Sequence, residues 1–397
     1  MVQGNKNRIL FLHTGLSTDM SITRMLRRIC ESIELEVLDI SVLVPDFAEQ
    51  LLDRVDDDLD SIRCVISLNV SAFYHFNVSG ECLHDKLGLP LVVFFVDHPA
   101  QFMESVPENL DNAMVLLIDP DFENFWHKYY PGKTLTHLCN LMPFSDHEAS
   151  EPPTFRQYRQ RTKKIFAPLQ MSYKNMNAIQ WWDFLNQLVP PMNTIAQKAV
   201  TSMINNTAQG IDQFIDQAIE EEGAELLPTE RYKLTVYVEG FAKMWRREII
   251  VGSLMEFPIV VSSGHIPEKF RSEYEHKFID TEGEETSRLY GEFQLVLNVS
   301  PAIPNLVQDR VINCVNAAST LISENNLGIS QYLVPDKDFV DFPFDSEVVQ
   351  EKVGNILEDP QRAYDMAVSA YTSLRNNDAR LQHWRDIFKK ALEMRQT

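Results

Sequence analysis

Four short polar segments contain the residue types that could carry out chemistry, and each of them follows an apolar run. They are His13–Asp19 (HTGLSTD), Asp97–Pro99 (DHP), Ser262–His265 (SSGH) and Asn298–Pro301 (NVSP). A short apolar run is typical of a buried strand, and open α/β sheets bind ligands beyond the carboxyl ends of their strands. We therefore expect a functional site to be built from these turns.

The turn Asp97–Pro99 places a carboxylate beside an imidazole. Burial at the mouth of a strand raises the pKa of an aspartate, and histidine titrates near neutrality, so Asp97 and His98 suit general acid–base catalysis. The alternative is that Asp97 caps the next helix and Pro99 begins it, a capping pattern that Asp119-Pro120-Asp121 repeats. The residues alone leave both interpretations open.

The other three turns suit close approach of an anion. Gly15 and the hydroxyls of Ser17 and Thr18 allow a ligand near the backbone, although such hydroxyls are also ordinary helix caps. The two later turns are small and hydroxyl-bearing, and such turns bind phosphates through backbone N–H groups. The sequence has no GxGxxG after its first strand, no GxxxxGK[ST], no HExxH and no GxSxG. Dinucleotide binding of the usual type, an ATPase and a metal site of familiar spacing are therefore disfavoured.

The first 150 residues alternate between strand and helix patterns. The expected strands are Arg8–His13, Leu35–Ile40, Cys64–Leu68, Pro90–Val96, Met114–Ile118 and Thr134–Cys139, and helices are expected at Ser21–Ile33, Phe47–Val55 and Glu81–Leu87. Continuously apolar strands are buried on both faces, which is typical of a parallel sheet covered by helices.

A second α/β segment begins near Tyr232. Its expected elements are a helix at Leu234–Met255, strands at Phe257–Val261, Lys277–Asp280, Leu295–Val299, Thr320–Ser323 and Tyr332–Val334, and closing helices from Ser346 to Met394. The stretch Asn175–Glu222 has helical spacing, and its apolar stripe and the pair Trp181-Trp182 predict helix core.

We accordingly predict an α/β fold of two facing Rossmann-like domains with a helical connecting segment. The expected limits are 1–150 for the N-terminal domain, 151–232 for the linker and helical segment, 233–375 for the C-terminal domain and 376–397 for a last helix. The ligand would lie in the cleft between the two domains.

Composition narrows the class of partner and the compartment. With 36 Lys+Arg and 57 Asp+Glu, the net charge is 36 − 57 = −21, which argues against nucleic acid and against permanent polybasic attachment to a membrane. The five cysteines are widely spaced and form no CxxC pair, a reduced pattern, and no leader-like or spanning apolar stretch is evident. We expect a cytoplasmic protein.

Part of the second half resembles a known family. Leu295–Ser300 and then Asp309–Ala318 (DRVINCVNAA) are similar to the C-terminal domain of CgeB-like bacterial glycosyltransferases of the GT-B class, in which a strand bearing Asn is followed by a helix of the form R-[VL]-F-E-x-x-A-x-G. The family's Glu falls on Asn313 and its Gly on Ala318. Phe344–Ala367 and Trp384 also resemble the family's C-terminal helices.

The resemblance implies transfer of a sugar from a nucleotide-sugar donor to a glycan, lipid-linked or protein acceptor, as in bacterial glycan or protein glycosylation. The donor would bind the second domain at a set of polar residues, namely Ser263, Gly264, Asn298, Ser300, Arg310 and Asn313. The acceptor would lie near His13 and Asp19, with Asp97 or His98 as the base. No cofactor and no metal are expected.

The departures at Asn313 and Ala318 keep a second hypothesis open, a non-catalytic GT-B-like binding or scaffold subunit. The sugar, the nucleotide base, retention or inversion, and a peripheral membrane or homodimer contact also stay open.

Overall fold

The computed structural model describes most of the chain as two compact units. The described residues are 7–15, 17–44, 47, 51, 59–73, 82–108, 110–130, 132, 134–138, 151–205, 209–281, 283–300, 303–375 and 379–394. Unit 1 is made of residues 1–143 with 378–397, and unit 2 of residues 144–377. Most of the predicted helix Phe47–Val55 lies outside the described residues, as do Cys139 and Pro301. No described helix is long and apolar enough to cross a bilayer.

Unit 1 is built on a parallel six-stranded sheet with the strand order β2-β1-β3-β4-β5-β6. The strands are β1 Arg8–His13, β2 Glu36–Ser41, β3 Ile62–Leu68, β4 Leu91–Phe95, β5 Ala113–Leu117 and β6 Leu135–Leu138. Every residue of β4 and β5 is buried, as their unbroken apolar sequences predict. All six predicted strands of this half are confirmed, with ends that shift by a residue or two.

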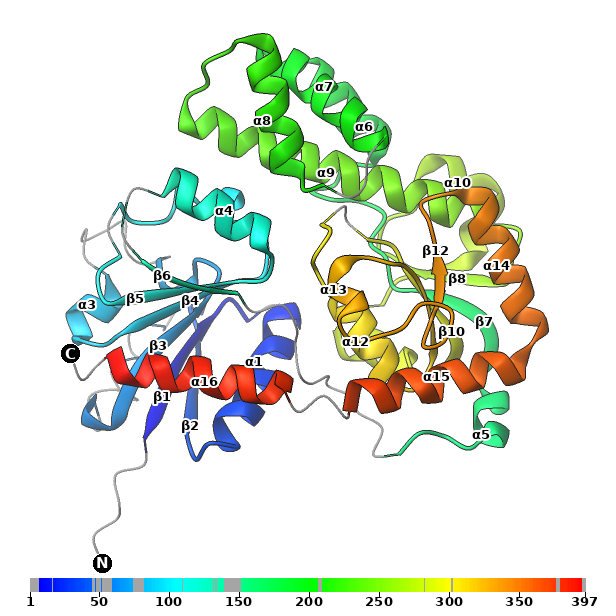
Figure 1. Ribbon diagram of the computed structural model, residues 1–397, viewed down its shortest axis with the longest axis horizontal. Helices are drawn as coiled ribbons and strands as arrows, with labels where there is room; N and C mark the ends of the chain where they lie inside the picture. Colours follow the sequence, from blue (N-terminus) through cyan, green and yellow to red (C-terminus); the bar gives the residue numbers. More distant parts are fainter. Residues whose placement is uncertain are drawn as a thin grey trace, which may run out of the picture. The chain divides into compact units, whose positions relative to one another are not determined.

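The helices of unit 1 cover this sheet (Figure 1). They are α1 Ser17–Glu31, α3 Leu83–Leu87, α4 Pro120–Tyr129 and α16 Ala379–Glu393, with short 3-10 turns at Leu59–Ser61, Ser71–Phe73 and Pro99–Gln101. The last helix, drawn red in Figure 1, is not a separate segment: the ring of Trp384 packs edge-on to Phe94 of β4 at 5.4 Å, and His383 contacts the carbonyl of Leu138. The last helix, α16, therefore belongs to unit 1.

Unit 2 contains a second parallel six-stranded sheet, ordered β12-β11-β10-β7-β8-β9. The strands are β7 Thr162–Ala167, β8 Ile259–Ser262, β9 Phe278–Ile279, β10 Phe293–Asn298, β11 Thr320–Glu324 and β12 Val340–Phe342. Strand β7 falls within residues 151–232, the range predicted as linker and helical segment, but it is hydrogen-bonded between β8 and β10 and belongs to this sheet.

The last strand of the second sheet differs from the prediction. Tyr332 ends a turn, and Leu333 and Val334 are irregular backbone rather than strand. The backbone N–H of Val334 donates to the buried carboxylate of Asp338 instead of to a neighbouring strand. The strand begins only at Val340, where Val340 and Phe342 point into the core and Asp341 points outward. The prediction of a strand at Tyr332–Val334 was wrong.

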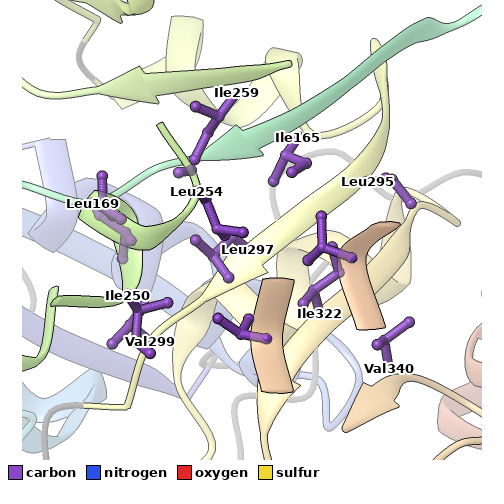
Figure 2. Close-up of a cluster of buried hydrophobic side chains, with 14 of the residues drawn as sticks. Ile165, Leu169, Ile250, Leu254, Ile259, Leu295, Leu297, Val299, Ile322 and Val340 are labelled. Carbon is purple, nitrogen blue, oxygen red and sulfur yellow. The ribbon is translucent and has the colours of Figure 1, made fainter. Parts of the chain in front are cut away.

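Helices cover both faces of the second sheet. They are α5 Phe155–Gln160, α10 Glu268–Tyr274, α11 Gly283–Leu289, α12 Asp309–Asn316, α13 Leu327–Ser330, α14 Ser346–Glu358 and α15 Pro360–Arg375, with a 3-10 turn at Glu275–Lys277. Figure 2 shows part of the hydrophobic core of this unit. There Ile165, Leu297 and Ile322 of the sheet lie near Ile250 and Leu254, at the end of the long helix Pro228–Ser253.

A helical lobe is inserted between β7 and β8. It consists of α6 Ala178–Asn186, α7 Met192–Asn205, α8 Ile211–Glu222 and the first half of α9 Pro228–Ser253. Trp181 is buried at its centre, as predicted, and a Cβ at Gly240 would lie only 2.7 Å from the Trp181 ring, so α6 and α9 are in very close contact. The second half of α9 leaves this lobe and packs on the second sheet.

Candidate functional site

The strand order of the second sheet marks where a ligand would bind. From β7 the chain continues to β8 and β9 on one side, and it then returns to β10 and continues to β11 and β12 on the other. The adjacent strands β7 and β10 are thus a topological switch point, the position at which open α/β sheets bind ligands beyond the carboxyl ends of their strands. In the first sheet the corresponding pair is β1 and β3.

Arg310, at the start of α12, lies at this switch point. Its Nε donates to Oδ1 of Asn298 over 3.1 Å, and its Nη2 is 3.5 Å from the carbonyl of Val299. Asn298 is only 1% exposed and donates in turn to the hydroxyl of Ser323. Asn298, itself fixed by Ser323, therefore holds the guanidinium of Arg310 in place.

A second arginine, which the sequence analysis did not select, reaches the same place from α9. Nη1 of Arg247 donates to the carbonyl of Gln170, in the loop after β7, over 2.7 Å. Its Nε is buried and has no hydrogen-bond partner among the described residues. Burial, and then the nearby charge of Arg310, lower the pKa of Arg247, and Asp309 opposes this only in part. A guanidinium stays charged in proteins, so this environment favours an anion between the two arginines.

Two further polar atoms close to these loops lack partners in the described part of the chain. They are Oε1 of Gln308, at the N-cap of α12, and Nε2 of His265, in the loop after β8. Each buried polar atom without a hydrogen bond costs about 1–3 kcal/mol. A polar ligand that reaches these atoms recovers this free energy.

Ser263 and Gly264, for which the sequence predicts a phosphate turn, lie in a loop that is shaped by internal hydrogen bonds. The hydroxyl of Ser263 accepts from the backbone N–H groups of Met171 and His265 and donates to the carbonyl of His265, so it is used to fix the turn. A Cβ at Gly264 would lie 3.1 Å from a carboxylate oxygen of Asp280. A carboxylate beside the turn repels phosphate, so the geometry favours Arg247 and Arg310 as the anion site.

Ser300 is held by a buried ion pair. Its backbone N–H donates to Oε2 of Glu324 over 2.9 Å, and its carbonyl accepts from Nε of Arg246 over 3.0 Å, while Arg246 and Glu324 form an ion pair. Burial raises the pKa of Glu324 and lowers that of Arg246, and each is opposed by the charge of the other. Arg246 is therefore structural, in contrast to its neighbour Arg247.

The two departures from the family pattern have local explanations. Asn313 lies on the same helix as Arg310, and its side chain hydrogen-bonds the buried Tyr290. Ala318 has a φ of 49° and follows the end of α12, a left-handed position at which glycine is the usual residue. Ala318 thus occupies a helix-terminating position.

In unit 1, Asp97 and His98 lie at the carboxyl end of β4. Oδ2 of Asp97 accepts from Nδ2 of Asn69 over 3.4 Å, and Asp97 is half-buried. His98 is only 3% exposed, and its Nδ1 accepts from the N–H of Ala100, so that His98 rather than Asp97 caps the turn that Pro99 begins. The rings of Phe122 and Phe125 pack on the imidazole at 4.5 and 4.9 Å. Asp97 is the more accessible of the two groups.

His13 and Asp19 lie on the other side of the switch point. His13 is buried at the end of β1, with its Nε2 3.9 Å from Oδ2 of Asp39, which pairs with Arg27. Asp19 is in α1, and its side chain lies outside the described part of the structure. Because β3 separates β1 from β4, His13 and Asp97 do not belong to adjacent strands.

Two solved structures are similar to this chain. T4 phage β-glucosyltransferase, in complex with UDP and Mn2+, has a TM-score of 0.54 at 10% identity, and the match covers 97% of this chain and 99% of that chain. The DNA-modifying enzyme β-glucosyltransferase, solved in the presence and absence of its substrate uridine diphosphoglucose, has a TM-score of 0.52 at 12% identity, with 97% and 99% covered. No protein-family model matches the sequence, and no curated protein is similar to it. The fold is therefore that of the GT-B glycosyltransferases, with two Rossmann-like α/β domains.

Proposed function

We propose that this protein is a glycosyltransferase that moves a sugar from a nucleotide-sugar donor to an acceptor hydroxyl. One observation carries the proposal: two arginines, Arg247 and Arg310, bind the loops beyond the adjacent strands β7 and β10, near enough for their charges to interact, and no described carboxylate forms an ion pair with both of them. A nucleoside diphosphate presents the paired negative charge that such a site lacks. The similar β-glucosyltransferase structures, one bound to UDP, support this assignment.

The two guanidinium groups would act on the leaving group. In the transfer, the bond from the anomeric carbon to the diphosphate oxygen breaks, and its electron pair goes to the nucleoside diphosphate. Arg247 and Arg310 stabilise the negative charge that develops there. The acceptor oxygen forms the new bond to the anomeric carbon and passes its proton to a base, for which we propose Asp97.

With two arginines in this role, we propose that the transfer step needs no added metal ion, although one similar structure holds Mn2+. Addition of Mg2+ or Mn2+ should then leave the rate of transfer unchanged.

We propose a glycan, lipid-linked or protein acceptor. One of the similar structures is a DNA-modifying enzyme, but a net charge of −21 disfavours a nucleic acid here. The pattern of Asp309–Ala318 supports a CgeB-like subtype, and the widely spaced cysteines support a cytoplasmic location in a bacterial cell.

The test is calorimetric titration with UDP, GDP and CMP and with the nucleosides uridine, guanosine and cytidine, after a thermal-shift panel has selected the base. We expect the matching diphosphate to bind far more tightly than its nucleoside. Arg247→Met and Arg310→Met should each weaken diphosphate binding by about 10- to 100-fold, the value of a charge-assisted hydrogen bond, and leave nucleoside binding unchanged. Arg362→Met, an exposed arginine of the same unit, is the control. Equal affinity for the selected nucleotide and its nucleoside would reject the site.

Turnover separates the enzyme from the alternative of a non-catalytic binding subunit. Both would bind a nucleotide at Arg247 and Arg310, but only the enzyme releases free nucleoside diphosphate from a nucleotide sugar. Tight binding without release, across a panel of acceptors, would favour the binding subunit.

A further inference from the structure

A cysteine, a histidine and an aspartate meet at the beginning of α3 in unit 1. Cys82, His84 and Asp85 each offer one ligand atom, and these atoms all lie within 4.8 Å of one another. The group is not evident from the sequence, because C-x-H-D has none of the familiar metal-site spacings. Cys82 is 4% exposed and His84 1%, whereas the side chain of Asp85 is 48% exposed. The group is therefore buried on one side and open to water on the other.

Hydrogen bonding within the described part of the chain does not satisfy the imidazole of His84. Its Nε2 lies 3.2 Å from the carbonyl of Asp111 and 3.2 Å from Oδ1 of Asp85. Its Nδ1 is buried and has no partner. When Nε2 carries the proton and donates to Asp111, Nδ1 holds an unused lone pair. Metal-bound histidines have this arrangement, with the second ring nitrogen donating to a backbone carbonyl.

The side chains can also close around an ion without rebuilding the fold. Cys82 is the N-cap of α3 and makes no side-chain capping bond, and its sulfur lies beside the carboxylate of Asp85. This carboxylate is exposed and lies 3.2 Å from the imidazole of His84. A movement of about 1 Å brings separations of this size to those of a tetrahedral site with bonds of about 2.0–2.3 Å.

We propose that Cys82, His84 and Asp85 bind a zinc ion that fastens the start of α3 to the segment before β5. A thiolate, an imidazole and a carboxylate together favour Zn2+ over Mg2+ or Ca2+, which take oxygen ligands. On binding, the thiol of Cys82 loses its proton to solvent, and a water molecule fills the fourth position on the exposed side.

The experiment uses the full chain, stripped of metal and then titrated with Co2+ as a spectroscopic probe and with Zn2+ in a thermal-shift assay. We expect saturation at one ion per chain, a thiolate-to-cobalt charge-transfer band, and an increase in Tm with Zn2+. Cys82→Ser should remove the charge-transfer band, and His84→Gln should weaken Co2+ binding. Cys30→Ser, at another buried cysteine of unit 1, should retain the charge-transfer band and the affinity for Co2+.

Absence of the charge-transfer band in the wild-type chain overturns the proposal, whether or not the variants fold. A band that survives in Cys82→Ser overturns it as well. The test is independent of the proposed function, because nucleotide binding is measured at unit 2 and a failure there leaves the cobalt spectrum unaffected.

Discussion

Arg310 donates from Nε to Oδ1 of Asn298 across 3.1 Å, and Asn298 donates to Ser323 on the next strand. The amide thus connects the ends of β10 and β11 to the first turn of α12. A long arginine side chain loses rotamer entropy when it binds an anion, and an arginine already held in position loses less.

Replacement of Asn298 by leucine tests this connection. Asn298→Leu keeps the branching and the number of side-chain heavy atoms but removes both hydrogen bonds, so diphosphate affinity should fall several-fold, by less than in Arg310→Met. Because the two residues act as one unit, Asn298→Leu should add little to Arg310→Met in the double variant. Calorimetric titration of all three variants measures this. Fully additive losses would show that Asn298 does not act through Arg310.

Variants of Asp97 and His98 should differ in which quantity they change, turnover for Asp97 and Tm for His98. Asp97→Asn should reduce turnover by about 100-fold or more and leave Tm and nucleotide affinity unchanged. His98→Asn keeps an acceptor for the N–H of Ala100, so it should retain turnover, whereas His98→Leu should lower Tm through loss of the cap. If His98→Asn abolishes turnover at an unchanged Tm, the imidazole takes part in the reaction.

Two helix-interior glycines form a matched pair. A Cβ at Gly240 would lie 2.7 Å from the Trp181 ring, whereas a Cβ at Gly354 would meet only Phe257, at 3.9 Å. Gly240→Ala should therefore lower the free energy of unfolding by about 1–3 kcal/mol, and Gly354→Ala should raise it by up to about 1 kcal/mol. Urea denaturation measures both. A stabilising Gly240→Ala would contradict the close packing of α6 on α9.

Ala318 offers a gain in stability. The left-handed conformation costs an alanine about 1–2 kcal/mol, and glycine avoids this cost but gains freedom in the unfolded chain. Ala318→Gly should therefore raise the free energy of unfolding by up to about 1 kcal/mol. The preceding Ala317 has a φ of −79° and a ψ of −2°, so Ala317→Gly should lower the same quantity. Equal effects at the two positions would contradict the backbone assignment.

Acid should weaken the fold partly through His137 on β6. Burial, Lys390 and His383 lower the pKa of His137, and Glu123 opposes them. The unfolded chain then takes up a proton more readily than the folded one, so the contribution of His137 is complete above a pH of about 6.5 and is lost as the pH falls below it. Urea denaturation at neutral and at mildly acid pH should show a smaller loss for His137→Asn than for the wild type. Equal losses would contradict the assignment.

The sequence predicted those parts of the fold that local pattern determines. Arg8–His13 is an apolar run flanked by polar residues, and β1 has the same ends. It did not predict β12, because Val340–Phe342 has only three residues and gains its place by pairing with β11. Arg310 was selected because its segment resembles the helix of the GT-B family pattern. Arg247 was missed because two adjacent arginines within a long helix give no sign of which one is buried in an ion pair and which one reaches a loop of the sheet.

Helix α9 has 26 residues and is therefore about 39 Å long. Leu234, near its beginning, is part of the core of the helical lobe, and Leu254, just beyond its end, is part of the core of the second sheet. Arg247 thus lies on a stiff helix whose other end is packed in a different hydrophobic cluster, that of the helical lobe. A displacement of the lobe is therefore transmitted along one continuous helix to the guanidinium of Arg247. The position of the lobe and the affinity for the anion are coupled in this way.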